Sequence, residues 1–144
     1  MNWLADEQSA RGIAAQVSPF FEARGFAVLA YCMMPDHVHL LLEGVLETAN
    51  LAEAVRLWKQ RTGFDWKRRT GNHLWQEGFH DRVLRESDDA VAVVRYILEN
   101  PVRAGLVSSM TEYPWIGSSR YGIAELLEHV GQWRPPWKSR SRNV

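Results

Sequence analysis

Residues 33–44 read Met-Met-Pro-Asp-His-Val-His-Leu-Leu-Leu-Glu-Gly, and this stretch decides the fold. Pro35 and Asp36 are turn formers that separate two apolar runs, one from Ala27 to Met34 and one from His37 to Glu43. Short apolar runs on either side of such a turn are typical of a β-hairpin. We therefore predict two antiparallel strands over these ranges.

The two histidines of this stretch are separated by one apolar residue. Successive side chains of a strand point to opposite faces, so His37 and His39 project from one face and Val38, Leu40 and Leu42 fill the other. Two imidazoles fixed side by side on a strand can provide two of the ligands of a metal ion. The alternative is a pair of partly buried histidines that bond to backbone groups, and the pattern alone leaves both interpretations open.

Two other histidine chemistries fit the pattern less well. A catalytic histidine triad of the nucleotidyl-hydrolase type needs a third histidine where this chain has Leu41. A structural zinc site uses further Cys or His ligands at short spacing. Cys32 is the only cysteine of the chain and lies inside the preceding apolar run, so a structural zinc site is disfavoured too.

Length and composition indicate one domain with its own core, because 46% of the 144 residues are hydrophobic. A single cysteine excludes an intramolecular disulfide and suits a reducing, cytoplasmic compartment. No run approaches the roughly 18 apolar residues of a membrane span, and the N-terminus lacks the pattern of a secretion signal. The formal net charge is zero, which neither indicates nor excludes a nucleic-acid partner.

The residues around the hairpin predict helices. Apolar residues at helical spacing predict a helix from Asp6 to Arg24. Asn50 with a glutamate three residues later resembles a capping box, and it starts a second helix whose apolar face runs toward Gly63.

The second half of the chain continues this alternation. A strand is expected from Leu74 to Leu84, and a helix from a cap at Ser87 to Glu99, which Pro101 breaks or kinks. We see no internal repeat and no linker. The organisation predicted is one domain over residues 1–131 and a basic tail over residues 132–144.

Basic residues gather between Arg56 and Arg69 of this neutral chain, and Asp65 is the only acidic residue in that stretch. Tryptophans stand among them and in the basic tail. Cations for phosphates beside rings for base stacking are what a single-stranded nucleic-acid site uses. A solvated helix face is the alternative. The candidate DNA contacts in this stretch are Arg56, Lys59, Arg61, Lys67, Arg68 and Arg69.

A second informative stretch runs from Val93 to Val107. Tyr96 and Asn100 are four residues apart, so they share one face of a helix, while Val94 and Ile97 point toward the core. Taken alone, a tyrosine on an amphipathic helix is most simply a core-edge residue with its hydroxyl in water.

These stretches together resemble the single-tyrosine HUH transposases, and most closely the REP-associated tyrosine transposase branch. The likeness covers roughly residues 27–121 and keeps three motifs in the family's order and spacing. The matching residues are Ala30–Leu42, Leu74–Gln76 with Phe79–Asp81, Tyr96–Val107 and Tyr113–Trp115.

The resemblance implies a ferredoxin-like (RRM-like) α+β domain, an antiparallel sheet with helices packed on it, that cleaves and rejoins single-stranded DNA. Tyr96 matches the nucleophile that forms a 5′-phosphotyrosine link. His37, His39 and Asn100 match the ligands of a divalent metal, Mg²⁺ or Mn²⁺. The implied partner is hairpin DNA from palindromic repeats. The implied location is the cytoplasm, in association with the nucleoid. Arg103, in the same motif as the tyrosine, is a further candidate DNA contact.

One departure from the family pattern is at the N-terminus. Relatives usually begin with a strand, whereas this chain passes almost directly from Met1 into the first predicted helix. Loss of a strand would expose the unpaired edge of its neighbour, and two chains could pair at that edge as a homodimer. Because the missing strand is central in relatives, its loss could also reduce activity. Two other functions stay open: a truncated or domesticated relative that binds hairpin DNA without cutting it, and a metal-dependent nuclease that uses water. A metalloprotein with no nucleic-acid partner is disfavoured by the basic and aromatic clusters and by the motif around Tyr96 and Asn100.

Overall fold

The structure is a computed structural model that describes residues 7–35, 37–74 and 90–132. In this part of the chain, three strands form one antiparallel sheet in the order β2–β1–β3. The predicted hairpin is confirmed, and each strand end lies within one residue of the expected position. The bounds are β1 Phe26–Met33, β2 Val38–Gly44 and β3 Ile116–Gly117.

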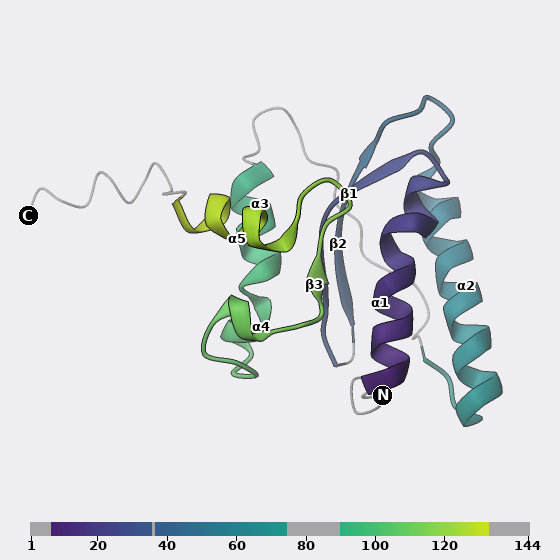
Figure 1. Ribbon diagram of the computed structural model, residues 1–144. Coiled ribbons are helices and arrows are strands. Elements are labelled where there is room, and N and C mark those ends of the chain that lie inside the picture. The colour runs from purple at the N-terminus through teal and green to yellow at the C-terminus, as the bar shows by residue number, and fades with distance from the viewer. Residues whose placement is uncertain (1–6, 36, 75–89, 133–144) are drawn as a thin grey trace, which may run out of the picture.

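Helices cover both faces of this sheet, as Figure 1 shows. α1 (Glu7–Glu22) and α2 (Leu51–Thr70) lie side by side against one face. The short 3₁₀ helix Met110–Glu112 precedes β3. The α+β class that the resemblance implied is confirmed. The other face is covered by α3 (Ala90–Leu98), α4 (Asn100–Arg103) and α5 (Ile123–Gln132).

β2 begins one residue later than predicted, so the two histidines do not both lie in the strand. The backbone N–H of Met34 donates to the carbonyl of His37 at 2.8 Å, which makes His37 the last residue of the turn. The strand ladder starts with the next pair, Met33 and Val38. His37 is thus fixed by the turn, and His39 is fixed by the strand.

An irregularity in β1 changes which of its residues face each of the two cores of the molecule. The pairing register with β2 shifts between Val28 and Ala30, so that Leu29 is the extra residue of a β-bulge. Val28 packs in the cluster under α1 and α2. Ala30 and Cys32 belong to the cluster under α3.

The core under α1 and α2 is built from large rings. Phe21 is fully buried, and its ring centroid lies 5.8 Å from that of Trp58. The alternate β2 residues Val38, Leu40 and Leu42 pack against this cluster, as the strand periodicity predicted.

α2 continues past Gly63, toward which its predicted apolar face ran. Its start agrees with the prediction, because the Asn50 side chain accepts a hydrogen bond of 3.1 Å from the Glu53 N–H. Gly71 ends it in the left-handed region at φ 77°. A glycine inside a helix costs about 1 kcal/mol relative to alanine. Burial of Trp66 in the last turns outweighs that cost.

The helix is interrupted at Glu99, between α3 and α4, as the proline at position 101 predicted. The Ser87 cap and all but the first residue of the strand predicted over Leu74–Leu84 fall outside the described residues, as does nearly all of the tail. The division into residues 1–131 and 132–144 stays a prediction. None of the described helices is long and apolar enough to cross a membrane.

Candidate active site

The two histidine rings of the β1–β2 hairpin meet at their outer nitrogens. The Nε2 atoms of His37 and His39 are 3.0 Å apart, and the ring planes are nearly perpendicular at 84°. Two nitrogen ligands bound at about 2.1 Å in neighbouring positions around one ion also lie about 3.0 Å apart. The pair therefore fits two ligands of a single metal ion.

The surroundings of His39 favour its neutral form. Burial lowers the pKa of the imidazole, and the nearby charges of His37 and Arg103 lower this pKa further. A metal ligand must be the neutral imidazole, because the proton and the metal compete for the same nitrogen. His39 is thus held in the state that binds a metal.

Tyr113 fixes the strand end that carries this hairpin turn. Its buried hydroxyl donates a hydrogen bond to the carbonyl of Met33, the last residue of β1. The Met33 N–H in turn donates to the carbonyl of Trp115 at 2.9 Å. Burial, together with Cys32, raises the pKa of the Tyr113 phenol, so it stays a donor. Sequence reasoning gave Tyr113 no role; its place in a family motif was the only signal.

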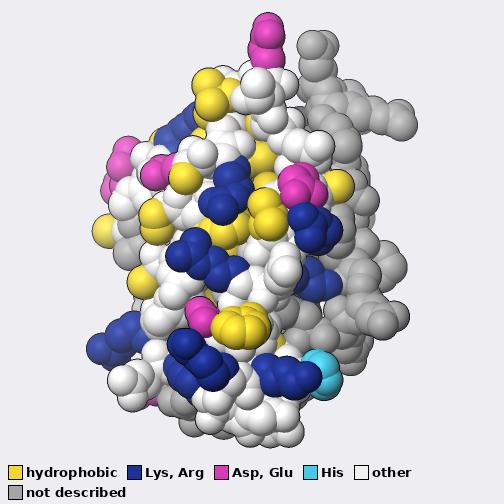
Figure 2. All heavy atoms as spheres, turned by 90° about the vertical axis from the view of Figure 1, so that its right-hand side faces the viewer, with side chains coloured by type: hydrophobic (Ala, Val, Ile, Leu, Met, Phe, Trp, Pro, Cys, Tyr) yellow, Lys and Arg dark blue, Asp and Glu magenta, His cyan; other side chains and the backbone are white. Residues whose placement is uncertain are grey.

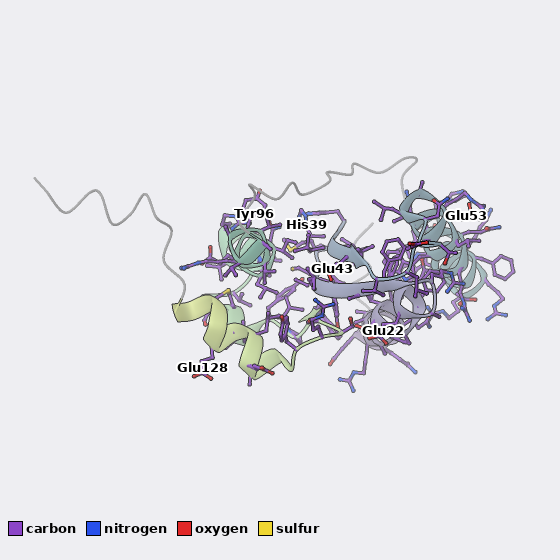
Figure 3. The ribbon with its side chains drawn as sticks, turned by 90° about the horizontal axis from the view of Figure 1, so that it is seen from above. Glu22, His39, Glu43, Glu53, Tyr96 and Glu128 are labelled. Carbon is purple, nitrogen blue, oxygen red and sulfur yellow. The ribbon has the colours of Figure 1, made fainter. Side chains whose placement is uncertain are left out.

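Tyr96 lies on α3 with its side chain toward solvent. Val94 and Ile97 of the same helix are buried in the cluster under α3, as predicted, and Tyr96 is 58% exposed. α3 packs beside both β1 and β2. Figure 3 shows Tyr96 and His39 at the same side of the molecule, and the Arg103 guanidinium that lies on the Tyr96 ring is near enough to His39 to lower the pKa of that imidazole. An accessible phenol therefore stands near the histidine pair.

Asn100 is the first residue of α4, directly after the break at Glu99. Glu99 keeps helical dihedral angles, φ −82° and ψ −7°, so Tyr96 and Asn100 retain nearly helical spacing across the break. The Asn100 Nδ2 atom is buried and has no hydrogen-bond partner among the described residues. Rotation of the amide exchanges this nitrogen for its oxygen, which is a metal-ligand type.

The amide matters because the described residues offer no third His, Cys, Asp or Glu that would complete a metal site with the pair. Among residues 7–35, 37–74 and 90–132, no group of three or more His, Cys, Asp or Glu side chains could hold a metal. A third protein ligand from this part of the chain must be of another type. The orphaned amide of Asn100 fits that requirement.

The predicted DNA contacts fall into separate groups. Arg103 lies at Tyr96, with its guanidinium 4.0 Å from the ring centroid. Lys67–Arg69 form the end of α2, at the same end of the molecule as the hairpin turn (Figure 1). Arg56 lies near the other end of α2 and is paired with Glu53 at 2.7 Å.

The exposed side of α2 mixes cations and rings. Figure 2 shows Lys and Arg side chains spread among apolar ones on this face. Phe64 is 67% exposed, and an open groove beside it is lined by Phe20, Arg24 and Arg61, among others. Lys59 lies on the same helix. The predicted combination of cations and aromatic rings is therefore present on the surface of α2.

Comparison with known proteins identifies the class. Residues 3–100 match the family described as IS200-like transposases, and the chain belongs to this family. Over 112 residues it is 28% identical to a Haemophilus influenzae protein provisionally named a REP-associated tyrosine transposase, a match that covers 70% of this chain and 64% of that one.

A solved structure shares the fold. It is the structure of a REP-associated tyrosine transposase bound to a REP hairpin, with a TM-score of 0.62 and 22% identity. The match covers 78% of this chain and 64% of the other. The chain thus spans less than two thirds of the length of either relative. The family resemblance found from the motifs is confirmed.

Proposed function

We propose that this chain cleaves and rejoins single-stranded hairpin DNA through a covalent link to Tyr96, with a divalent metal. One observation carries the proposal: two histidine Nε2 atoms converge at 3.0 Å near a phenol that is 58% exposed. A nucleophile beside a ready pair of metal ligands suits attack on a phosphodiester.

His37, His39 and Asn100 would hold the ion, which we expect to be Mg²⁺ or Mn²⁺. All three side chains are neutral ligands, so none of them cancels the charge of the ion as a carboxylate would. When bound, the ion supplies Lewis-acid polarisation of the scissile phosphate.

Tyr96 would act as the nucleophile. The phenol must lose its proton, to solvent or to a base, as its oxygen attacks the phosphorus. The bond from Oη to phosphorus forms while the bond from phosphorus to the 3′-oxygen breaks, which leaves a 5′-phosphotyrosine and a free 3′-hydroxyl. A phenolate leaves more readily than an alkoxide, so a 3′-hydroxyl can reverse the step and rejoin the strand.

The DNA is expected to run from the site along the basic end of α2. Lys67, Arg68 and Arg69 lie at the same end of the molecule as the histidine turn. Lys59 and Arg61 extend the positive surface along the helix, whereas the pairing of Arg56 with Glu53 makes Arg56 the weaker candidate. The hairpin named for the solved relative supports a palindromic-repeat hairpin as substrate. A homodimer through the β2 edge stays a prediction.

A covalent-adduct assay tests the proposal. Labelled hairpin oligonucleotides from the DNA flanking the gene are incubated with the protein and Mg²⁺ or Mn²⁺, then separated on a denaturing gel. We expect a metal-dependent shifted band that is lost in Tyr96→Phe and in His37→Ala. Tyr121→Phe is the matched control, because Tyr121 is also exposed, at 43%, and should leave the band unchanged.

Two other results would contradict the proposal in different ways. Hairpin binding by a folded protein without any adduct would indicate a binding module that has lost catalysis. Strand cleavage that survives Tyr96→Phe would indicate a nuclease that uses water as the nucleophile.

A further inference from the structure

Two contacts of Arg103 are with Tyr96, the residue that carries the phenol, and a third is with Glu99. Its guanidinium carbon lies 4.0 Å from the centre of the Tyr96 ring. Its Nη2 atom donates a hydrogen bond to the backbone carbonyl of Tyr96. Its Nη1 atom lies 3.8 Å from a carboxylate oxygen of Glu99.

The break in the helix explains why residue 103 reaches residue 96. α3 ends at Leu98, and the last carbonyls of a helix have no partner within it. Pro101, one residue into α4, has no N–H to offer to the carbonyl of Ile97, four residues before it. The Arg103 side chain donates to another of these last carbonyls, that of Tyr96, as basic side chains near a helix C-terminus commonly do.

Glu99 holds this arrangement from the other side. Its carboxylate is bound by Arg95 at 2.7 Å as well as by Arg103 at 3.8 Å. The Glu99 side chain is only 32% exposed, so this shared ion pair is partly shielded from solvent. Arg103 therefore has a ring, a carbonyl and a carboxylate of its own chain as partners.

We propose that Arg103 is a positioning residue for the nucleophile rather than a DNA contact, and this inference rests on the proposed tyrosine chemistry. An exposed tyrosine samples several rotamers, whereas a ring covered by a guanidinium is restricted to fewer of them. Holding a nucleophile in its reactive orientation raises the rate of the chemical step. The planar fork of arginine can stack and donate at once, which a lysine ammonium cannot do.

Single-turnover kinetics separate the two roles. At saturating hairpin DNA, Arg103→Ala should slow adduct formation by about tenfold to a hundredfold while the half-saturating DNA concentration stays unchanged. Arg103→Lys, which keeps the charge but lacks the planar fork, should fall between Arg103→Ala and the unaltered protein. A shift of the half-saturating concentration and of its salt dependence, with an unchanged maximal rate, would show a phosphate contact and overturn the proposal.

Arg95→Ala is the matched control. It removes the other arginine bound to Glu99 but leaves the contacts between Arg103 and Tyr96 in place. We expect an adduct rate within about twofold of that of the unaltered protein, the scale of a surface substitution. A loss equal to that of Arg103→Ala would assign the effect to the charge of the helix end and contradict the proposal.

A second measurement does not depend on catalysis. The chain has four tyrosines, so fluorotyrosine labelling gives a simple fluorine NMR spectrum in which Tyr96→Phe identifies the Tyr96 signal. Arg103→Ala and Arg103→Lys should shift that signal and leave the Tyr121 signal in place. An unshifted Tyr96 signal would refute the stacking. Absence of any adduct in the unaltered protein would instead refute the proposed function, and the spectrum would still test Arg103.

Discussion

The face of the sheet under α1 and α2 is packed with large aromatic rings, whereas the face under α3 combines aliphatic side chains with smaller and polar ones. Phe21 and Trp58 are almost fully buried on the first face. On the second face the strand positions nearest the site are Ala30, Cys32 and His39. The first face is thus devoted to packing, whereas the second holds, beside its own apolar cluster, groups that chemistry needs but packing does not.

The second face also contains groups that cost stability. Asn100 has a buried amide nitrogen without a partner among the described residues. A buried donor with no hydrogen bond costs about 1–3 kcal/mol. Such a cost is tolerable only where the rest of the fold compensates, and it is typical of a position kept for binding or catalysis.

The largest expected effect tests the stabilising face. Phe21→Ala should lower the free energy of unfolding by about 3–5 kcal/mol, because it leaves a cavity in the ring cluster. Urea unfolding followed by circular dichroism measures this change. Phe64→Ala, at a phenylalanine that is 67% exposed, is the control and should change it by less than about 0.5 kcal/mol. If the two variants lost similar free energies of unfolding, the ring cluster would not be the stabilising part of the first face.

An intermediate effect is expected where the β3 side of the sheet supports the site. Tyr113→Phe removes the hydrogen bond to the Met33 carbonyl and should lower the free energy of unfolding by about 1–3 kcal/mol. Since that bond fixes the strand end before the histidine turn, Mn²⁺ affinity measured by calorimetry should fall as well. Loss of stability with unchanged Mn²⁺ affinity would show that the turn holds the histidines by itself.

The smallest effect on stability is expected at the orphaned amide. Asn100→Leu replaces an unsatisfied polar group with an apolar one of similar size, so the free energy of unfolding should stay unchanged or rise by up to about 1 kcal/mol. The same variant should lose Mn²⁺ affinity. A stability loss above about 1 kcal/mol would show that the amide is satisfied in solution and that the polar face carries no such cost.

Local patterns were enough to predict the elements that carry the site. The hairpin, the Asn50 cap and the exposure of Tyr96 opposite Val94 and Ile97 follow from strand and helix periodicity, which depends on neighbouring residues only. The motifs were also enough to indicate the family, which the comparisons confirm.

The features that local patterns do not predict depend on residues far apart in the chain. α2 passes Gly63 because Trp66 is buried against other elements, which helix propensity does not report. Tyr113 bonds to Met33 across 80 residues, and no local pattern predicts that contact. The Arg103 side chain lies on the ring of Tyr96, a contact that no local pattern predicts.

The sequence by itself therefore determined which side chains are available for the chemistry and which of them share a face. Tertiary structure decided which of these faces meet. It brought the Nε2 atoms of His37 and His39 together, packed α3 beside β2 and placed the Arg103 guanidinium over the ring of Tyr96. The physical reason is that backbone geometry fixes the direction of a side chain within one or two turns, whereas the approach of distant segments depends on how the whole core packs.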